Sequence, residues 1–218
     1  MDDTYPDLSP GLTLLRTEHP QSSSMHRLVL NHILDAEGVT YWLDAGNTAS
    51  TYALYDLAPS RRALRNVKIA RAFTAYQHHE LVRMTVSEAS PRTSFLVAPN
   101  VGTLYRDGDL MTVEREGLFE SSVTILAELA EVLDVPVLVT ARGDTRETEL
   151  VADLAETEID VERTKYGPRY ESEDFETTVY WMNGWFQTTI PYWVDLFGVA
   201  PEERSPLEHG VRPEDIRA

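Results

Sequence analysis

Apolar runs of strand length alternate with helical segments along the first two thirds of the chain, and this alternation constrains the fold more than any other feature. The runs lie at residues 11–16, 39–44, 67–73, 94–99 and 135–141. Apolar side chains at helical spacing separate them, most clearly at 25–36 and 118–133. Buried strands that alternate with helices form parallel sheets covered on both faces. We therefore expect an α/β fold with a mostly parallel sheet flanked by helices.

The last third of the chain has a different pattern. Residues 158–166, 175–182 and 185–190 have strand character, and Asn183-Gly184 is a strong hairpin signal because both turn positions need positive φ. This predicts an antiparallel extension over residues 158–190, within one domain of residues 11–197. Residues 1–10 are expected to be a polar lead-in. Residues 198–218, rich in Pro, Glu and Arg, are expected to be a mobile acidic tail.

The charge balance limits the partners that the chain can bind. The formal net charge is −17, and only Lys68 and Lys165 are lysines among the 19 basic residues. An acid excess with few lysines is typical of a halophilic protein from a salt-accumulating cytoplasm; an acidic protein encoded by a GC-rich genome is the alternative. In ordinary buffer this charge repels nucleic acid and anionic membranes. In molar salt the Debye length is about 3 Å, so acidity alone does not exclude a DNA-related role.

Several chemistries are not expected from the composition. The chain has no cysteine, so it has neither disulfides nor thiolate sites. No apolar run approaches the roughly 18 residues of a membrane span, and the acidic N-terminus does not resemble a signal peptide. The six histidines show no metal-ligand spacing. We expect a cytoplasmic protein with no membrane partner, no metal and no cofactor.

The connection between the first strand and the first helix occupies the place of a phosphate-binding loop. That loop needs glycines, a lysine and a Ser or Thr. Laid on the pattern, Thr17 and Ser22 replace the glycines, Ser23 replaces the lysine, and only Ser24 fits. Pro20 also removes a backbone N–H donor. A serine-capped helix start describes these residues better than a phosphate site.

The stretch Tyr-Trp-Leu-Asp-Ala-Gly-Asn-Thr, residues 41–48, ends an apolar run in an acid and turn residues. It resembles the second core strand of RecA-superfamily recombinases of the RadA and RadB type, where the run is followed by Asp-x-Glu-x-Thr. Asp44, Asn47 and Thr48 match, whereas Gly46 lies where the family has the glutamate that activates water.

Two further strands extend the resemblance to roughly residues 11–166. Residues 71–73 resemble part of the family's third strand. Pro99 lies at the position of the aspartate that holds Mg²⁺ in the family. The resemblance thus implies a RecA-like core in which the phosphate lysine, the phosphate glycines, the glutamate and the metal aspartate are all replaced. We therefore expect a degenerate ATPase core without enzymatic activity.

The resemblance also implies a function. We expect a non-catalytic accessory or adaptor protein in DNA recombination, repair or replication that binds a protein partner: a recombinase, a replication or repair factor, or a second copy. The alternatives are an atypical nucleotide-binding ATPase that uses Ser22–Ser24 and Asp44, and a single-stranded DNA-binding paralogue. The DNA-binding loops of the family correspond to residues 105–117 and 142–156. They carry Arg106, Arg142 and Arg146 among many acids.

Two other clusters have open interpretations. Arg61, Arg62 and Arg65 lie on a polar connection, where they are either solvated or in contact with phosphate. Seven aromatic residues are concentrated near the C-terminus: Tyr180, Trp181, Trp185, Phe186, Tyr192, Trp193 and Phe197. They either pack the hairpin on the sheet or form an exposed patch for a protein partner.

Overall fold

A computed structural model describes most of the chain up to residue 188. The described residues are 5–19, 22–45, 47, 51–106, 111–165, 167–173, 175–182 and 185–188, the last two ranges as backbone. Gly46, Thr48, Tyr192, Trp193, Phe197 and residues 198–218 lie outside this part of the chain. Among the described helices, none has both the length and the apolar character that crossing a bilayer requires.

The strands form one nine-stranded sheet in the order β3-β2-β4-β5-β1-β6-β7-β8-β9. Their bounds are β1 Gly11–Thr17, β2 Val39–Ala45, β3 Val67–Ala72, β4 Thr93–Ala98, β5 Pro136–Ala141, β6 Thr157–Thr164, β7 Gly167–Ser172, β8 Phe175–Met182 and β9 Trp185–Thr188. The pairings from β3 to β6 are parallel, and those from β6 to β9 are antiparallel. The expected α/β class, with its mostly parallel sheet and antiparallel C-terminal strands, is confirmed.

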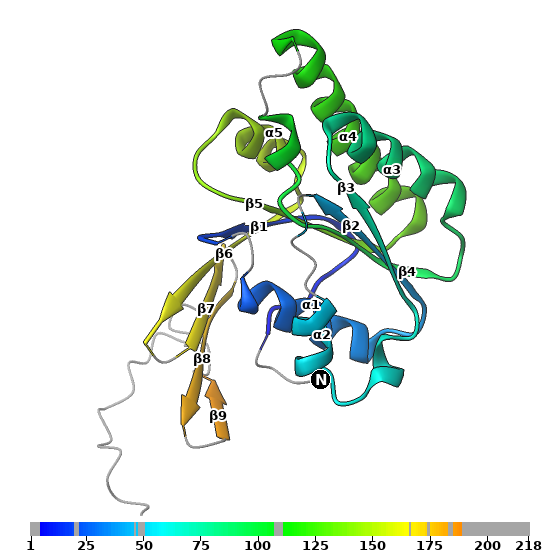
Figure 1. The fold of residues 1–218 in the computed structure, drawn as a ribbon. Coiled ribbons are helices and arrows are strands. Elements are labelled where there is room, and N and C mark those ends of the chain that lie inside the picture. The colour runs from blue at the N-terminus through cyan, green and yellow to red at the C-terminus, as the bar shows by residue number, and fades with distance from the viewer. Residues whose placement is uncertain are drawn as a thin grey trace, which may run out of the picture.

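The two faces of the sheet are covered by different helices. The helices are α1 Ser23–Asp35, α2 Thr51–Leu57, α3 Ala75–Glu88, α4 Thr112–Leu133 and α5 Arg146–Leu154, with short 3₁₀ turns η1 Arg61–Leu64 and η2 Thr103–Tyr105. Figure 1 shows α1 and α2 on one side of the sheet and α3, α4 and α5 on the other. This division follows from the strand order, because right-handed crossovers in opposite directions along a sheet lie on opposite faces.

Each face has its own apolar core, since successive side chains of a strand point to opposite faces. Leu14 and Leu43 belong to the cluster beneath α3 and α4, whereas Leu15 and Trp42 belong to the cluster beneath α1. Trp42 and Leu126 are completely buried. The strands β1, β2, β4 and β5 are therefore buried along nearly their whole length, which is why they appear in the sequence as continuous apolar runs.

Two expected boundaries are wrong. Helical spacing in the sequence begins at residue 118, but α4 begins at Thr112, because Glu and Arg are good helix formers even where nothing apolar is buried. The segment 158–166 was assigned wholly to the antiparallel extension, but β6 pairs parallel with β1 on one side and antiparallel with β7 on the other. The strand β7 was not predicted, because Gly167 and Pro168 at its start are typical of turns.

Candidate functional site

The candidate site is the edge of the sheet where the parallel strands end. Ligands of open α/β sheets bind at this edge where neighbouring strands lead to helices on opposite faces. The strand order creates such a place between β1, followed by α1, and β5, followed by α5. The fold brings Thr17 at the end of β1, Asp44 near the end of β2 and Pro99 just after β4 to this edge.

The start of α1 is held by the backbone and by packing, not by a serine cap. Ser22 is the N-cap residue, but its side chain makes no capping hydrogen bond. Its carbonyl instead accepts a hydrogen bond from His26 Nδ1 at 2.9 Å. The Ser24 carbonyl accepts a hydrogen bond from the buried Tyr170 hydroxyl at 2.9 Å. The expected serine capping is therefore wrong, and Ser22–Ser24 are fixed through main-chain groups.

Asp44 is compensated by an arginine of the neighbouring strand. Its side chain is fully buried, and Arg71 Nε lies 3.1 Å from Asp44 Oδ2. Asp44 and Arg71 are also register partners in the parallel pairing of β2 and β3. The Arg71 guanidinium, which forms the described ion pair at the end of β2, is therefore already bound to Asp44.

Two buried histidines flank the end of β2, one from each helical layer. Burial lowers the pKa of His26, while the hydrogen bond to Ser22 and the charge of Asp44 raise it. Burial lowers the pKa of His78 to about 4, His79 lowers it further, and Asp44 raises it. Both side chains are therefore neutral at pH 7.

The hydrogen bonds of His78 determine which ring nitrogen carries its proton. The Ser122 hydroxyl donates to the Leu118 carbonyl at 2.8 Å, so it accepts from the Tyr105 hydroxyl, also at 2.8 Å. The Tyr105 oxygen then accepts from His78 Nδ1 at 2.8 Å. His78 Nε2 therefore carries a lone pair. His26 has the same tautomer, because its Nδ1 faces a carbonyl, which can only accept.

Several buried polar atoms near this edge have no hydrogen-bond partner within the described part of the chain. They are Thr17 Oγ1, His26 Nε2, Trp42 Nε1 and His78 Nε2. The two imidazole nitrogens are acceptors, so they suit a ligand that donates hydrogen bonds. A phosphate needs donors and positive charge. Trp42 Nε1 and Thr17 Oγ1 can donate, but none of these four atoms carries positive charge, so they do not by themselves form a phosphate site.

Neither of the two lysines lies in the connection between β1 and α1. Lys68 lies in β3, where its Nζ is 3.3 Å from the Tyr41 hydroxyl, and Lys165 follows β6. At the end of β4, Asn100 has φ 51° and its backbone N–H donates to Thr140 Oγ1 at 2.8 Å. No group of three or more His, Asp or Glu residues in the described ranges could hold a metal ion.

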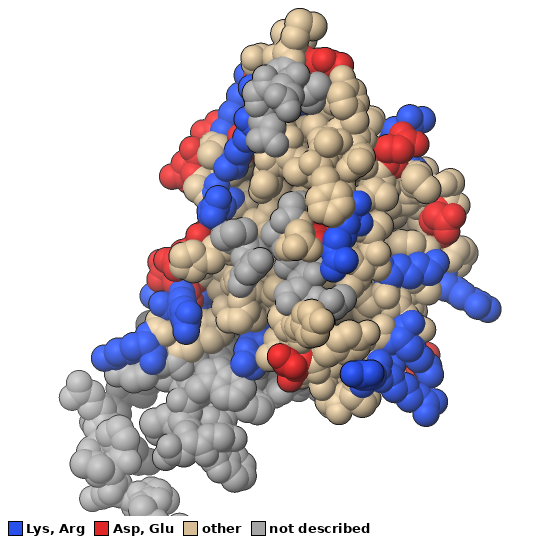
Figure 2. Space-filling view, in the orientation of Figure 1, with Lys and Arg blue, Asp and Glu red and all other residues tan. Residues whose placement is uncertain are grey.

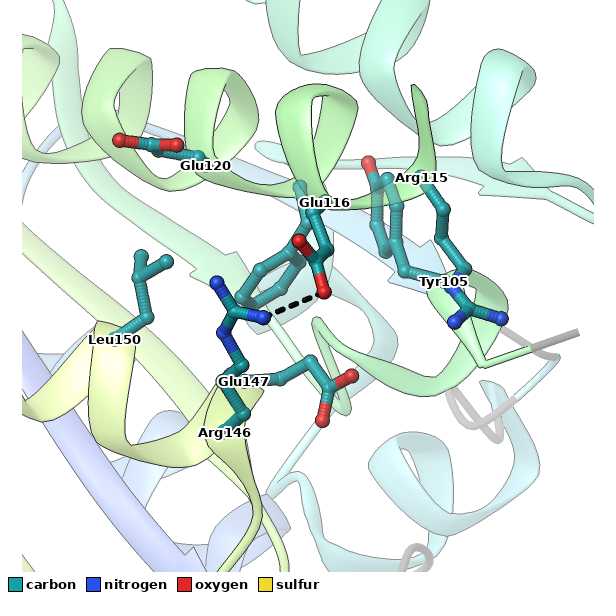
Figure 3. A pocket seen from close by; sticks show the side chains of 8 residues that line it. Tyr105, Arg115, Glu116, Glu120, Arg146, Glu147 and Leu150 are labelled. Atoms are coloured by element: carbon teal, nitrogen blue, oxygen red, sulfur yellow. Dashed lines mark hydrogen bonds and ion pairs between the residues drawn. The ribbon is translucent and has the colours of Figure 1, made fainter. Parts of the chain in front are cut away.

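A small cavity of about 60 Å³ lies between α4 and α5. Figure 3 shows Arg146 pointing across it to Glu116. The Arg146 guanidinium lies 2.6 Å from Glu116. Arg106 contacts Glu147 at 3.8 Å and the Thr145 hydroxyl at 3.1 Å. Two of the three arginines expected to contact DNA therefore neutralise acids of the protein. Arg142, the third, is exposed and lines a crevice of about 10 Å³ with Arg106.

The buried network of His78, Tyr105 and Ser122 was not predicted from the sequence. His79 Nδ1 also lies 3.0 Å from the Ser122 hydroxyl. The sequence feature that could have indicated this network is Ser122, a polar residue on the apolar face of α4. Its side chain is completely buried. A buried hydroxyl requires partners, and its partners lie on the facing helix and on η2.

The aromatic segment is described only in part. β8 and β9 pair antiparallel with Trp181 opposite Phe186 and Tyr180 opposite Gln187, so the predicted hairpin strands are confirmed. The side chains of Tyr180, Trp181, Trp185 and Phe186 lie outside the described part of the structure. No known protein-family model matches the chain, and no curated protein has a significantly similar sequence.

Proposed function

We propose that this protein is a non-catalytic accessory protein of DNA recombination, repair or replication that acts by binding another protein. The observation that carries the non-catalytic part is the chemistry of the sheet edge. Asp44 forms an ion pair with Arg71. His26 and His78 are neutral, and the Nε2 atom of each has no hydrogen-bond partner among the described residues. Phosphoryl transfer needs fixed positive charge around the phosphates. The resemblance of residues 41–48 and 71–73 to recombinases supports the DNA-related part.

An apolar groove at the free edge of the sheet supports the protein-binding part. β3 is the terminal strand of the described sheet, so one row of its backbone groups has no neighbouring strand. Beside it lies a groove of about 170 Å³. Its lining residues are Tyr41, Leu43, Lys68, Ile69, Ala70, Leu81, Met84, Thr85 and Glu88. An extended peptide can add to such an edge and place a side chain in the adjoining groove.

Calorimetry tests the absence of nucleotide binding. Titration of the full chain with ATP and Mg²⁺ in molar KCl is expected to give no binding at micromolar nucleotide. A micromolar dissociation constant would instead support the atypical ATPase, in which Ser22–Ser24 and Asp44 hold the nucleotide. In that case Asp44→Asn would weaken binding, whereas Asp153→Asn on α5 would not.

A matched pair of methionines tests the groove. Met84 lines it and is 51% exposed, whereas Met111 is 77% exposed at the start of α4 and is not among the groove's lining residues. In affinity purification from the native host at high salt, Met84→Glu is expected to lose proteins that Met111→Glu retains. If both variants recover the same proteins, the contact does not lie in the groove, and the aromatic segment of residues 180–197 becomes the candidate surface. There, Trp185→Ala and Trp193→Ala are the corresponding variants.

A further inference from the structure

We propose that the surface formed by α2 and η1 binds single-stranded nucleic acid. The α2–η1 surface consists of Tyr52, Tyr55, Arg61, Arg62 and Arg65. It is separate from the β3 groove and from the arginines between α4 and α5. The proposal goes beyond the accessory function and does not depend on it.

The charge of this part of the chain is opposite to that of the whole. Residues 51–66, which include α2 and η1, have three basic side chains, Arg61, Arg62 and Arg65, against one acidic, Asp56, a net charge of +2 in a chain of −17. Figure 2 shows Lys and Arg gathered over the part of this face that carries α2 and η1, with few acids among them. Local positive charge on an acidic protein is the electrostatic feature that a phosphate backbone requires.

The three arginines are available to a ligand. Arg61, Arg62 and Arg65 are all exposed, and none of them forms an ion pair with a carboxylate in the described part of the chain. Arg106 and Arg146, by contrast, are held by Glu147 and Glu116. Arginine suits this role because its guanidinium donates two parallel hydrogen bonds to phosphate and also stacks on flat rings.

Two tyrosines stand on the same surface. Tyr52 is 81% exposed and Tyr55 is 48% exposed. They are one helical turn apart on α2, so they point in similar directions. The Arg61 guanidinium lies 5.6 Å from the centre of the Tyr55 ring, which joins η1 to α2 in one surface. Leu54 and Leu64 contribute to the core beneath it, so the surface rests on a packed base.

The combination specifies single strands rather than duplexes. Exposed aromatic rings stack on bases, which only an unpaired strand presents, while nearby cations follow its phosphates. A duplex offers phosphates but no free base faces to Tyr52 and Tyr55. Because ring stacking is tolerant of base identity, we expect little preference between DNA and RNA of similar composition.

Fluorescence anisotropy with labelled dT and rU oligonucleotides of 20 nucleotides tests the proposal. The full-length chain is titrated at several KCl concentrations at which circular dichroism shows it folded. Binding is expected, with log K falling against log [KCl] at a slope of about −2, as for three phosphates on a single strand. The triple variant Arg61→Gln, Arg62→Gln, Arg65→Gln is expected to lose at least about tenfold in affinity and most of this slope.

Two matched variants separate the surface from bulk charge and from fold. Arg83→Gln, Arg92→Gln, Arg163→Gln removes the same charge from exposed positions elsewhere and is expected to bind within about twofold of wild type. Tyr52→Ala, Tyr55→Ala is expected to lose about fivefold per ring, whereas Tyr52→Phe, Tyr55→Phe keeps the rings and the affinity. Circular dichroism of each variant confirms that the fold is retained.

Four outcomes would overturn the proposal. The first is no binding at any salt concentration at which the protein is folded. The second is an equal loss in the two arginine triples. The third is equal affinity for duplex and single strand. The fourth is displacement of the oligonucleotide by polyglutamate at equal charge, which would assign the surface to an acidic protein partner. None of these results bears on Met84 or on ATP, so the accessory function is tested separately.

Discussion

Arg71 faces Asp44 across the pairing of β2 and β3, and its Nε lies 3.1 Å from the buried Asp44 carboxylate. Asp44 lies near the end of β2 and Arg71 near the end of β3. In this fold the two residues satisfy each other. The sheet edge therefore contains a buried acid, but among the described residues the arginine beside it at the end of β2 is bound to that acid.

Removing Arg71 is expected to destabilise the fold. Arg71→Gln removes the cation that pairs with a fully buried carboxylate, which costs about 2 kcal/mol of unfolding free energy because the arginine is itself partly exposed. Urea denaturation in molar KCl measures this. Arg83→Gln breaks an exposed ion pair with Glu80 and should cost less than about 1 kcal/mol. Equal costs for the two variants would contradict the buried pair.

His78 is expected to make stability fall in mild acid. Its pKa is lowered from 6.5 to about 4 in the fold, so between these values the unfolded chain binds more protons. The contribution of His78 to the free energy of unfolding is therefore complete above pH 6.5. It is lost as the pH falls towards 4, and the total loss is about 3 kcal/mol.

The difference in unfolding free energy between wild type and His78→Gln should follow that pH window. His79→Gln is the control, because His79 is only partly buried and should have a smaller effect. A wild-type stability that does not change between pH 7 and 5, relative to His78→Gln, would contradict a buried neutral His78.

The Tyr105 hydroxyl is expected to stabilise the interface between α3 and α4. Tyr105→Phe removes the acceptor of His78 Nδ1 and the donor to Ser122. A buried imidazole N–H without a partner costs about 1–3 kcal/mol. Thermal or urea unfolding of Tyr105→Phe measures this cost, and Tyr55→Phe, on the exposed side of α2, should unfold as wild type.

Two glycines are expected to respond to alanine with opposite signs. Gly38 has φ 153°, and a Cβ there would lie 2.6 Å from Ser94 Cβ and 2.7 Å from the Arg92 carbonyl oxygen. Gly38→Ala should therefore lower stability by more than about 1 kcal/mol. Gly117 lies inside α4, and apart from the adjoining backbone of its own helix no described atom lies within 4 Å of its Cβ position, so Gly117→Ala should raise stability by about 0.5–1 kcal/mol. Urea midpoints of both variants measure the signs.

Much of the architecture could be predicted from local patterns. The inner strands β1, β2, β4 and β5 are apolar because both faces of the sheet are covered, and the hairpin strands around residues 183–184 follow from a turn signal. The boundaries failed where the local pattern was neutral. The first turn of α4 buries little, and β7 begins with Gly167 and Pro168. The periodicity of apolar residues depends only on which side chains a segment buries. An exposed helix start such as that of α4, or a short strand such as β7, therefore has a weak signal in the sequence.

The sequence by itself determined the alternation of strands and helices, the absence of thiol chemistry and the lack of glycine and lysine between the first strand and helix. Only the tertiary structure decided that β5 lies between β1 and β4, that Arg71 neutralises Asp44, and that Tyr105 and Ser122 bind His78. It also decided that Arg106 and Arg146 are paired while Arg61, Arg62 and Arg65 are exposed. Each of these depends on which strands and helices become neighbours, and that choice is made by packing between distant segments.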